Sequence, residues 1–264
     1  MNESLVKYLA GLLDADGSLS FAFKSDQNRV GREFVGLCLS LASSDAIDLH
    51  GFIETLPTLT GMGAVYRYGA KQQFKAWKIS KRSDLEMILP RLTKHMVIKA
   101  RHWDWMLAQW RDYRRTSCSV ADAEKLKAAS KLSRIARVGP LKAKSHPTWA
   151  WTAGYLDGDG WYRYSFEKSQ NYWQMHVGAV AHKNDASVLE FLTKAFGGNT
   201  FEHGQSPDVF TWRRSVGVMD RSFALKFLPN LAKHSRLKRH KIDQMIHHHR
   251  QRLSDQSAEA QATV

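Results

Sequence analysis

Two stretches of the sequence nearly repeat each other: LAGLLDADG at residues 9–17 and TAGYLDGDG at residues 152–160. Both carry small residues four positions apart, and both end in two aspartates and a glycine. Residues four apart lie on one face of a helix, and small side chains on that face let two helix backbones come closer than the usual ~8–10 Å. We therefore expect two helices that pack together through these small residues. They are Gly11 and Ala15 in the first copy and Gly154 and Gly158 in the second.

A second repeat extends the similarity beyond the acidic motifs. LPRLTKHMVIKARHWDWM at residues 89–106 matches LPNLAKHSRLKRHKIDQM at residues 228–245, with Leu, Pro, Leu, Lys, His, Lys, Asp and Met in register. The two copies keep nearly the same distance from their acidic motifs, so the repeating unit is a whole domain of about 140 residues and not a solenoid repeat. We expect two halves at 1–115 and 147–250, a lysine-rich and partly helical linker at 116–146 and a flexible tail at 251–264.

Hydrophobic periodicity changes in the same order in both halves. SLSFAFK, directly after Gly17, alternates apolar and polar residues, as does WYRYSFEKS around Trp161, and this alternation is typical of half-buried strands. Further strands and helices follow in the same sequence, including helices expected at 45–56 and 185–196. Each half is therefore predicted as α-β-β-α-β-β-α-α, which is an α+β fold.

The charge balance indicates the kind of partner. The chain has 39 Lys and Arg against 25 Asp and Glu, a net charge of +14. This excess favours a polyanion such as nucleic acid, although charge alone is also consistent with a merely soluble, basic surface.

The remaining composition indicates the compartment. Two cysteines, Cys38 and Cys118, are too few for a disulfide framework, which favours a reducing environment. The N-terminus lacks the layout of a signal peptide, and no apolar run approaches the ~18 residues of a membrane span. We expect a soluble intracellular protein with no membrane partner, with the bacterial cytoplasm and an organelle matrix both open.

Several chemistries could use the acidic motif. A calcium-binding EF-hand loop is excluded, because its first and last ligand positions would fall on Leu12 and Phe23, and the second copy fails in the same way. A pair of glycosidase carboxylates would need a sugar cleft, of which the composition gives no sign. A turn-capping role is reasonable for Asp14 and Asp157 but is weaker for all four aspartates together.

The second aspartate of each copy points to metal chemistry. If the two helices pack as predicted, Asp16 and Asp159 meet at their C-terminal ends. Two carboxylates there repel each other and the negative ends of the helix dipoles. A divalent cation resolves this conflict, and Mg²⁺ binds one or two carboxylates together with substrate phosphate oxygens and water.

The two motifs, the domain-length duplication and the element order resemble a single-chain LAGLIDADG homing endonuclease. The first copy differs from the string that names the family only by Leu13 in place of isoleucine, and the resemblance covers nearly the whole chain except the linker and the tail. It implies two halves related by a pseudo-two-fold axis, each with a four-stranded antiparallel sheet, that together form a saddle over DNA.

The resemblance also implies an activity. We expect a monomer, without an obligate protein partner, that hydrolyses both strands of a long asymmetric double-stranded DNA site and leaves 3′ overhangs. Mg²⁺ would be the cofactor, Mn²⁺ would substitute for it, and Ca²⁺ would bind without supporting cleavage. No protein-splicing blocks flank the halves, so intron homing or a free-standing gene is favoured over an intein. The alternative is a relative that binds nucleic acid without cutting it, such as an RNA maturase or a DNA-binding regulator.

The same resemblance assigns roles to particular positions. The metal ligands would be the carboxylates of Asp16 and Asp159, assisted by the backbone carbonyls of Ala15 and Gly158. A basic residue would lie near each scissile phosphate, either for catalysis or for affinity alone, and a polar residue at the end of the second strand would order the attacking water. The basic positions are Lys99 and Lys238, with Arg101 and Arg239 as rivals, and the polar positions are Ser43 and His182.

DNA sequence would be read by outward-facing side chains of the strands in successive major grooves. Glu167 is informative among these, because an acidic residue on such a face is better suited to accept from cytosine N4 than to contact phosphate. The positions are Ser18, Ser20, Lys24, Tyr66, Tyr68, Lys78 and Ser80 in the first half, and Arg163, Ser165, Glu167, Gln174, His176, Arg213 and Ser215 in the second. They differ far more between the halves than the helices do, which favours an asymmetric site over a palindrome.

Overall fold

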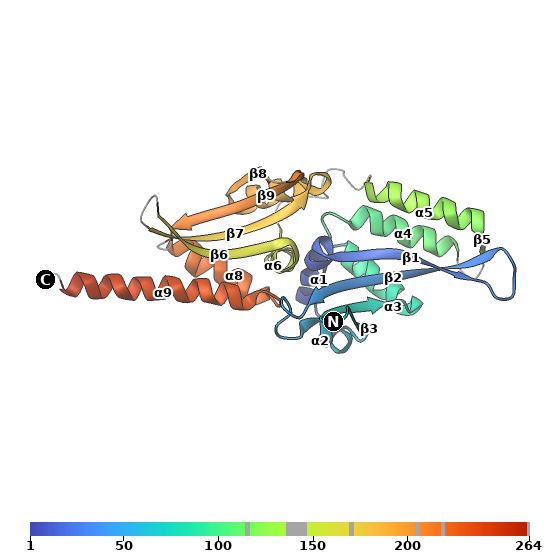
Figure 1. The fold of residues 1–264 in the computed structure, drawn as a ribbon, viewed down its shortest axis with the longest axis horizontal. Helices are drawn as coiled ribbons and strands as arrows, with labels where there is room; N and C mark the ends of the chain where they lie inside the picture. The colour runs from blue at the N-terminus through green and yellow to red at the C-terminus, as the bar shows by residue number, and fades with distance from the viewer. Residues whose placement is uncertain (114–116, 136–146, 169–171, 204–205, 218–219, 263–264) are drawn as a thin grey trace.

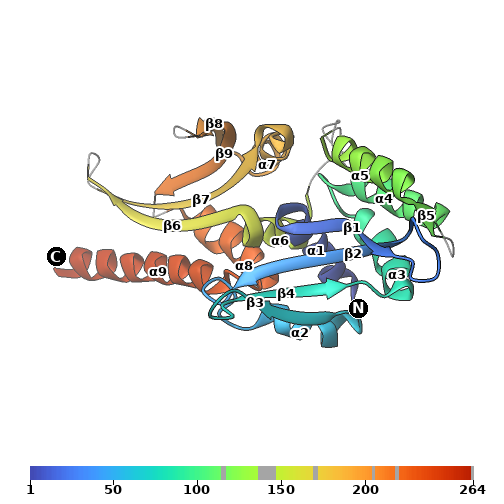
Figure 2. The same cartoon turned by 45° about the vertical axis from the view of Figure 1, so that its right-hand side comes forward.

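The computed structural model describes residues 1–113, 117–135, 147–168, 172–203, 206–217 and 220–262. Its two halves lie end to end along the long axis of the molecule, and helices α1 and α6 meet between them (Figure 1). Each half contains an antiparallel sheet with helices packed on one side, which confirms the predicted duplicated α+β fold (Figure 2).

The first half follows the predicted order. Its elements are α1 (Glu3–Ala15), β1 (Gly17–Ser25), β2 (Arg32–Ser44), α2 (Phe52–Thr60), β3 (Ala64–Tyr68), β4 (Phe74–Ile79), α3 (Arg82–Thr93) and α4 (Ala100–Asp112). The strand order is β1-β2-β4-β3. We call this sheet A.

The second half repeats the order with short additional turns. Its elements are α6 (Trp149–Asp159), β6 (Gly160–Glu167), β7 (Tyr172–His182), the 3₁₀ turn η1 (Lys183–Asp185), α7 (Ser187–Phe196), β8 (Asn199–His203), β9 (Ser206–Gly217), the π turn η2 (Phe223–Phe227), α8 (Leu228–His234) and α9 (Arg239–Ala262). The strand order β6-β7-β9-β8 matches that of sheet A. We call this sheet B.

Matching registers make the two sheets comparable residue by residue. Gly17 pairs with Leu41 in sheet A, and Gly160 pairs with Ala179 in sheet B. On the central strands, Leu41 pairs with Trp77, whose equivalent Trp212 pairs with Ala179. Both tryptophans are fully buried, and each donates from Nε1 to a backbone carbonyl at 2.9 Å. The sheets therefore share one architecture, with one side chain layer in the core and the other on an exposed face.

Local side chains decide where helices begin. The Asn2 side chain accepts a 2.8 Å hydrogen bond from the Leu5 amide and so caps α1. The helix expected at 45–56 begins only at Phe52, and this part of the prediction was wrong. The reason is Asp48, whose carboxylate accepts hydrogen bonds from the Phe52 and Ile53 amides at 2.6 and 2.9 Å and so fixes a later start.

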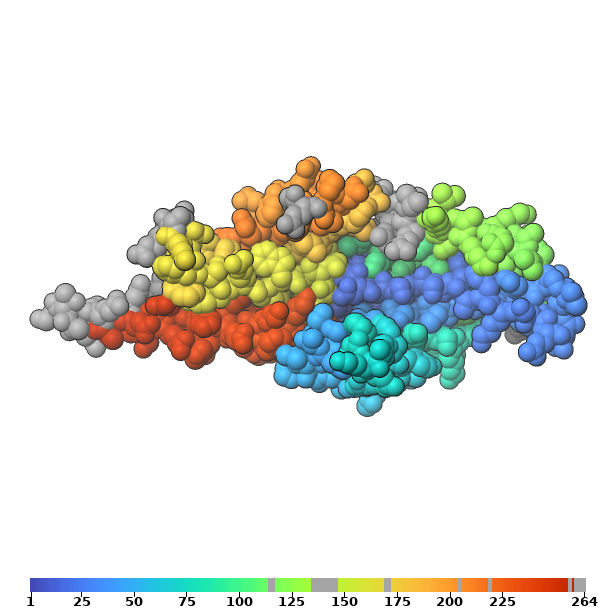
Figure 3. All heavy atoms as spheres, viewed as in Figure 1, coloured from blue at the N-terminus to red at the C-terminus, as the bar shows by residue number. Residues whose placement is uncertain are grey.

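The segments outside the two halves also contain helices and a short strand. Part of the expected linker forms β5 (Cys118–Ser119), which pairs with β2, and α5 (Val120–Ile135), which packs on α4 and β2. Residues 116 and 136–146 of that linker lie outside the described residues. Helix α9 continues to Ala262, so the expected flexible tail at 251–264 is helical along most of its length (Figure 1). In the space-filling view of Figure 3, the described part of α9 lies along the lower edge of the second half. Among the described residues, no helix is long and apolar enough to cross a membrane.

Candidate active site

The small residues of the two motifs let α1 and α6 touch backbone to backbone. A Cβ placed on Gly11 would lie 2.0 Å from the Trp151 carbonyl oxygen, and one on Gly154 would lie 2.0 Å from the Tyr8 carbonyl oxygen. A Cβ on Gly158 would lie 2.4 Å from the Cβ of Ala15. All of these separations are shorter than real carbon atoms tolerate, so the geometry requires glycine at each position. The predicted helix interface therefore exists, with the four small residues at its centre.

The first aspartate of each motif accepts hydrogen bonds from the backbone just before the last helix of its half, α4 or α9. Asp14 is buried, and its carboxylate accepts hydrogen bonds from the backbone amides of Val97, Ile98 and Lys99 at 2.6–3.2 Å. Burial raises the pKa of Asp14, while hydrogen bonds from Val97 and Lys99 oppose that shift. Asp157 accepts from the corresponding amides before α9. This agrees with a structural role for the first aspartates, which were left outside the predicted catalytic set.

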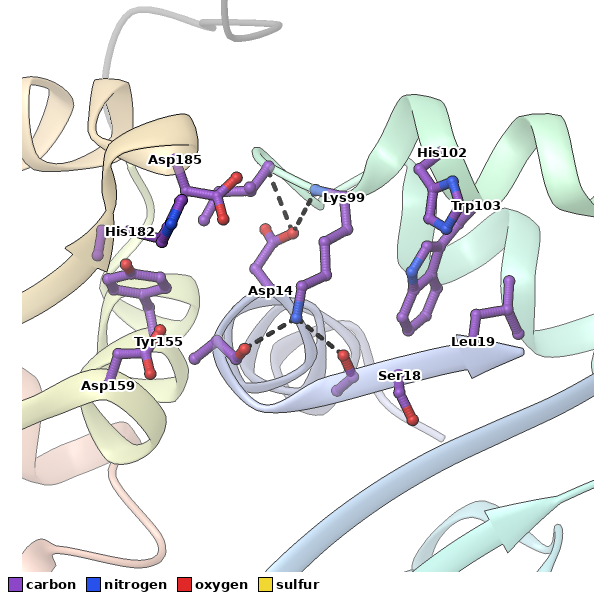
Figure 4. A pocket seen from close by; sticks show the side chains of 14 residues that line it. Asp14, Ser18, Leu19, Lys99, His102, Trp103, Tyr155, Asp159, His182 and Asp185 are labelled. Atoms are coloured by element: carbon purple, nitrogen blue, oxygen red, sulfur yellow. Dashed lines mark hydrogen bonds between the residues drawn. The ribbon is translucent and has the colours of Figure 1, made fainter. Parts of the chain in front are cut away.

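The two predicted lysines bind the carbonyl ends of α1 and α6. Lys99 Nζ donates to the carbonyl oxygens of residues 13, 15 and 17 at 2.8–2.9 Å, as Figure 4 shows in part. Lys238 Nζ donates to those of residues 156, 158 and 160 at 2.6–3.2 Å. An ammonium has three donors, and its positive charge is favourable at the negative end of a helix dipole. Both lysines therefore fix the backbone that carries the second aspartates.

The rival arginines lie elsewhere. Arg101 is exposed on α4. Arg239 donates from Nε to Asp243 at 3.0 Å and from Nη1 to the Ala232 carbonyl at 2.7 Å, so its guanidinium is bound to its own half. Of the four predicted basic residues, only the two lysines are adjacent to the motif backbone.

The second aspartates come together at the ends of the crossing helices. A Cβ on Gly158 would lie 3.1 Å from Asp16 Oδ2, which places the first carboxylate directly beside the second motif. Burial, followed by the charge of Asp16, raises the pKa of Asp159 to about 7. Desolvation by the neighbouring protein atoms also raises the pKa of Asp16, and the ammonium groups of Lys238 and Lys99 oppose this shift. The Asp16 residue is nevertheless exposed to solvent. The two halves thus supply two mutually repelling carboxylates to one place.

A cavity of about 220 Å³ opens beside Asp159 and is lined by residues of both halves. Lys99 and Asp14 come from the first half, and Asp159, His182 and Asp185 come from the second (Figure 4). The sequence did not single out Asp185, because a carboxylate at the expected start of a helix is ordinary. Only the fold places it beside Asp159.

One of the two predicted water-ordering positions needs correction. The register makes Ser44, and not Ser43, the equivalent of His182. Ser43 follows the alternation of Leu39 and Leu41 and so belongs to the helix-facing side of β2. A difference of one residue along a strand moves a side chain to the opposite face of the sheet. His182 does line the cavity.

The predicted DNA-reading residues share the exposed faces of the two sheets. Ser18 pairs with Ser40, which pairs with Lys78, and Arg163 pairs with His176, which pairs with Ser215, so each set crosses its sheet on one side. The set on sheet A is Ser18, Ser20, Lys24, Tyr66, Tyr68 and Lys78, with Ser80 just after β4. The set on sheet B is Arg163, Ser165, Glu167, Gln174, His176, Arg213 and Ser215.

His176 differs from the expectation for a base-reading side chain. It is 9% exposed, and its ring nitrogens make hydrogen bonds with the hydroxyls of Ser165 and Ser215 at 3.0 and 2.8 Å. Burial, followed by the charges of Arg213 and Arg163, lowers its pKa. His176 therefore lies buried beneath the exposed side chains of this face, and its hydrogen bonds link β7 to β6 and β9.

Comparison with known proteins agrees with this architecture. No protein-family model matches the sequence, and no curated protein matches it. The LAGLIDADG homing endonuclease I-GzeII, in complex with its DNA target, superposes with a TM-score of 0.69 at 13% identity, covering 95% of this chain and 91% of that one. The LAGLIDADG meganuclease I-AabMI, bound to uncleaved DNA, gives 0.68 at 14% identity, over 97% and 92%.

A third similar protein is I-SmaMI, in two states. Bound to cleaved DNA it gives a TM-score of 0.64 at 16% identity, covering 93% of this chain and 87% of that one. Bound to an uncleaved target with calcium ions it gives 0.61 at 16% identity, over 89% and 85%. The chain therefore has the two-domain fold of the single-chain LAGLIDADG homing endonucleases.

Proposed function

We propose that this protein is a sequence-specific DNA endonuclease that makes double-strand breaks by divalent-metal-dependent hydrolysis. The observation that carries the proposal is the meeting of Asp16 and Asp159 at the ends of two helices in backbone contact. The net charge of +14 suits a polyanionic substrate. Proteins of the same fold are bound to DNA targets, one of them cleaved.

The donor set fits Mg²⁺ with substrate phosphate better than a closed protein site. Among the described residues, no group of three or more His, Cys, Asp or Glu side chains could hold a metal ion. Asp16 and Asp159 provide two carboxylates, and the carbonyls of Ala15 and Gly158 lie next to them. Mg²⁺ commonly binds through one or two carboxylates and completes its shell with phosphate and water. When bound, such ions activate water and stabilise the charge that develops on phosphate.

The residues of the chain have separate tasks in this proposal. Asp16 and Asp159 bind the metal ions. Because each half contributes one aspartate, one chain can cleave both DNA strands. Lys99 and Lys238 position these aspartates through the carbonyls of the motif backbone, in place of the direct phosphate contact that the sequence indicated. His182 lines the cavity from which a water could be oriented. The exposed faces of sheets A and B recognise the target in successive major grooves.

Cleavage of a plasmid that carries the genomic insertion site of this gene tests the activity. With Mg²⁺ the native protein should give one linear product, and the ends should carry 5′ phosphates and 3′ overhangs. Asp16→Asn and Asp159→Asn should each abolish double-strand breaks while leaving DNA binding in place. Mn²⁺ should restore cleavage after chelation of Mg²⁺, and Ca²⁺ should support binding alone.

Other outcomes distinguish the alternatives. Specific binding without cleavage in any divalent metal would favour a non-cutting relative, such as an RNA maturase or a DNA-binding regulator. Cleavage by Asp16→Asn at the native rate would overturn the proposed metal site. Sedimentation of the complex with one chain per target would support a monomer, and an intron boundary beside the gene would support intron homing.

A further inference from the structure

Each sheet ends in a hairpin that points away from the central helices α1 and α6. We call residues 21–36 outer hairpin A, and residues 164–168 with 172–175 outer hairpin B; they lie at opposite ends of the molecule (Figure 1). Strand β4 pairs with β2 only from Leu39 onward, and β9 pairs with β7 only from Gln174 onward. The ends of both hairpins therefore extend past the neighbouring strand, and a two-stranded hairpin needs packing against another element to be stable.

Outer hairpin A is held by the segment that follows α4. Strand β5 pairs with the end of β2, and Arg32 Nε donates a 3.0 Å hydrogen bond to Ser117 Oγ. From α5, Lys127 Nζ lies 4.6 Å from the centre of the Phe23 ring. Backbone pairing and side-chain contacts thus support this hairpin together.

In the second half, α9 itself provides the support. Helix α9 is longer than its equivalent α4 and runs alongside β6 (Figure 2). The His248 ring stacks on Tyr164, with ring centres 4.2 Å apart and planes 3° apart, and Tyr164 stacks on Trp173 at 4.6 Å. The Arg252 guanidinium lies 5.3 Å from the centre of the Trp173 ring. One continuous stack therefore joins α9 to both strands of outer hairpin B.

This support is less complete than that of outer hairpin A. A cavity of about 330 Å³ lies between α9 and the hairpin and is lined by Tyr164, Trp173, His248, Gln251, Arg252 and Asp255. Phe166, at the end of β6, is 42% exposed. Outer hairpin B therefore depends on the side chains that His248 and Arg252 extend from α9.

These contacts lie on the side of sheet B that faces the helices. Tyr164 shares that side of β6 with buried Tyr162, whereas Arg163 is exposed on the opposite side. His248 and Arg252 can therefore act on recognition without touching DNA, because they fix the strands that carry the outward side chains. A segment that is held in place before binding loses less entropy on binding.

We propose that His248 and Arg252 are positioning residues that hold outer hairpin B for recognition of the end of the DNA target under sheet B, as β5 and α5 hold outer hairpin A at the other end. This rests on the proposed DNA-binding function and extends it to helix residues behind the sheet. Loss of either side chain loosens the hairpin and weakens recognition at that end of the target alone.

Targets shortened from either end test the proposal. Binding is measured with the Asp16→Asn, Asp159→Asn double variant, so that cleavage does not intervene, on a site selected from randomised DNA. An iron chelate on Val30→Cys, at the fully exposed tip of outer hairpin A, marks the end of the site under sheet A. Base pairs are then removed from one end or the other, and the dissociation constant of each target is measured.

The expected result is coupling between α9 and one end of the target. Arg252→Met should weaken binding to the full site about two- to fivefold, the range expected for a cation over a ring near the surface. On a target shortened under sheet B the variant should bind as the parent double variant does, because the affected contacts are already absent. Shortening under sheet A should weaken both proteins equally. His248→Ala should give the same pattern.

Two further variants separate positioning from charge and from folding. Arg250, exposed on the same helix, provides the charge-matched control, and Arg250→Met should show no coupling to either end. Arg252→Lys keeps a cation near the indole and should restore the parent pattern. Thermal unfolding of each variant shows whether the fold is intact.

Two results would overturn the proposal. One is equal weakening of all targets by Arg252→Met, which would indicate a general effect on folding or charge. The other is a loss of affinity on shortening under sheet B that stays the same in Arg252→Met and His248→Ala. Absence of any selected sequence would instead overturn the proposed function.

Discussion

The Tyr8 hydroxyl donates a 2.8 Å hydrogen bond to Asp157 Oδ2 across the interface between the two halves. The relationship is mirrored by Trp151, whose Nε1 donates to Asp14 Oδ2 at 3.0 Å. Each helix of the central pair thus satisfies the buried carboxylate of the other. The same two carboxylates hold the amides before α4 and α9, so the contact between halves is linked to the placement of the last helices.

Tyr8→Phe should therefore destabilise the whole protein and not one half alone. The ring is kept, but a buried carboxylate loses one donor, which costs about 1.5–3 kcal/mol of the free energy of unfolding. Chemical denaturation followed by tryptophan fluorescence measures this loss. Tyr66→Phe, at an exposed tyrosine, is the control and should leave the midpoint unchanged. Equal stabilities of the two variants would show that the cross-interface bond is unimportant.

Gly154→Ala should disrupt the helix interface, because its Cβ would lie 2.0 Å from a backbone oxygen that no side chain rotation can move. Overpacking of this kind costs about 1–3 kcal/mol or more. Gly36→Ala is the matched control, since its nearest atom would be 3.4 Å away. Thermal unfolding should show a lower midpoint for the first variant and little change for the second. A wild-type midpoint for Gly154→Ala would contradict the close contact.

The two aspartates of the first motif should separate stability from cleavage. Asp14→Asn replaces an acceptor of three backbone amides with a group that offers one carbonyl oxygen, and should cost about 2–4 kcal/mol of stability. Asp16→Asn removes charge repulsion with Asp159 and should leave stability equal or higher, while double-strand cleavage is lost. Denaturation and plasmid cleavage measured on both proteins check this, and a loss of stability with Asp16→Asn would refute it.

Without metal, the stability should depend on pH through Asp159. Its pKa is raised from 3.8 to about 7 in the folded protein, so the folded state holds a proton that the unfolded state has released. The stabilising contribution is complete below about pH 4 and is lost as pH rises to about 7. Asp159→Asn should flatten this part of the pH profile. Mg²⁺ binding, which requires the carboxylate, should strengthen with pH over the same range, as calorimetry would measure.

Cys38 should report DNA binding directly. It lies partly exposed on the outer face of sheet A, whereas Cys118 is 5% exposed. Burial raises the pKa of the Cys38 thiol, so modification by a maleimide is expected to be slow and to accelerate with pH. Target DNA should slow modification of Cys38 at least severalfold, as mass spectrometry of the labelled peptides would show. Unchanged labelling in a saturated complex would mean that this face does not contact DNA.

Much of the fold was predictable because the sequence contains an internal repeat, so that each half supports the assignment of helices and strands in the other. The duplicated motif predicted helix contact at Gly11 and Gly154, and the alternation after Gly17 gave the correct exposed face for sheet A. Local periodicity could not fix the start of α2, since Asp48 decides it through two backbone amides. Nor could it fix the register at the end of β2, where Ser44, and not Ser43, is the equivalent of His182.

The sequence by itself determined the two helices in contact, the duplicated order of elements and the two metal-binding candidates, because these depend on residue size and spacing along a helix. Only the tertiary structure placed Lys99, Lys238, Asp185 and His176 beside their neighbours. The ammonium groups of Lys99 and Lys238 lie on the carbonyl ends of α1 and α6, a placement that no pattern in the sequence indicated. The physical reason is that each of these side chains contacts groups that are far away in the sequence. A local sequence pattern does not specify which distant groups the fold brings within hydrogen-bonding distance.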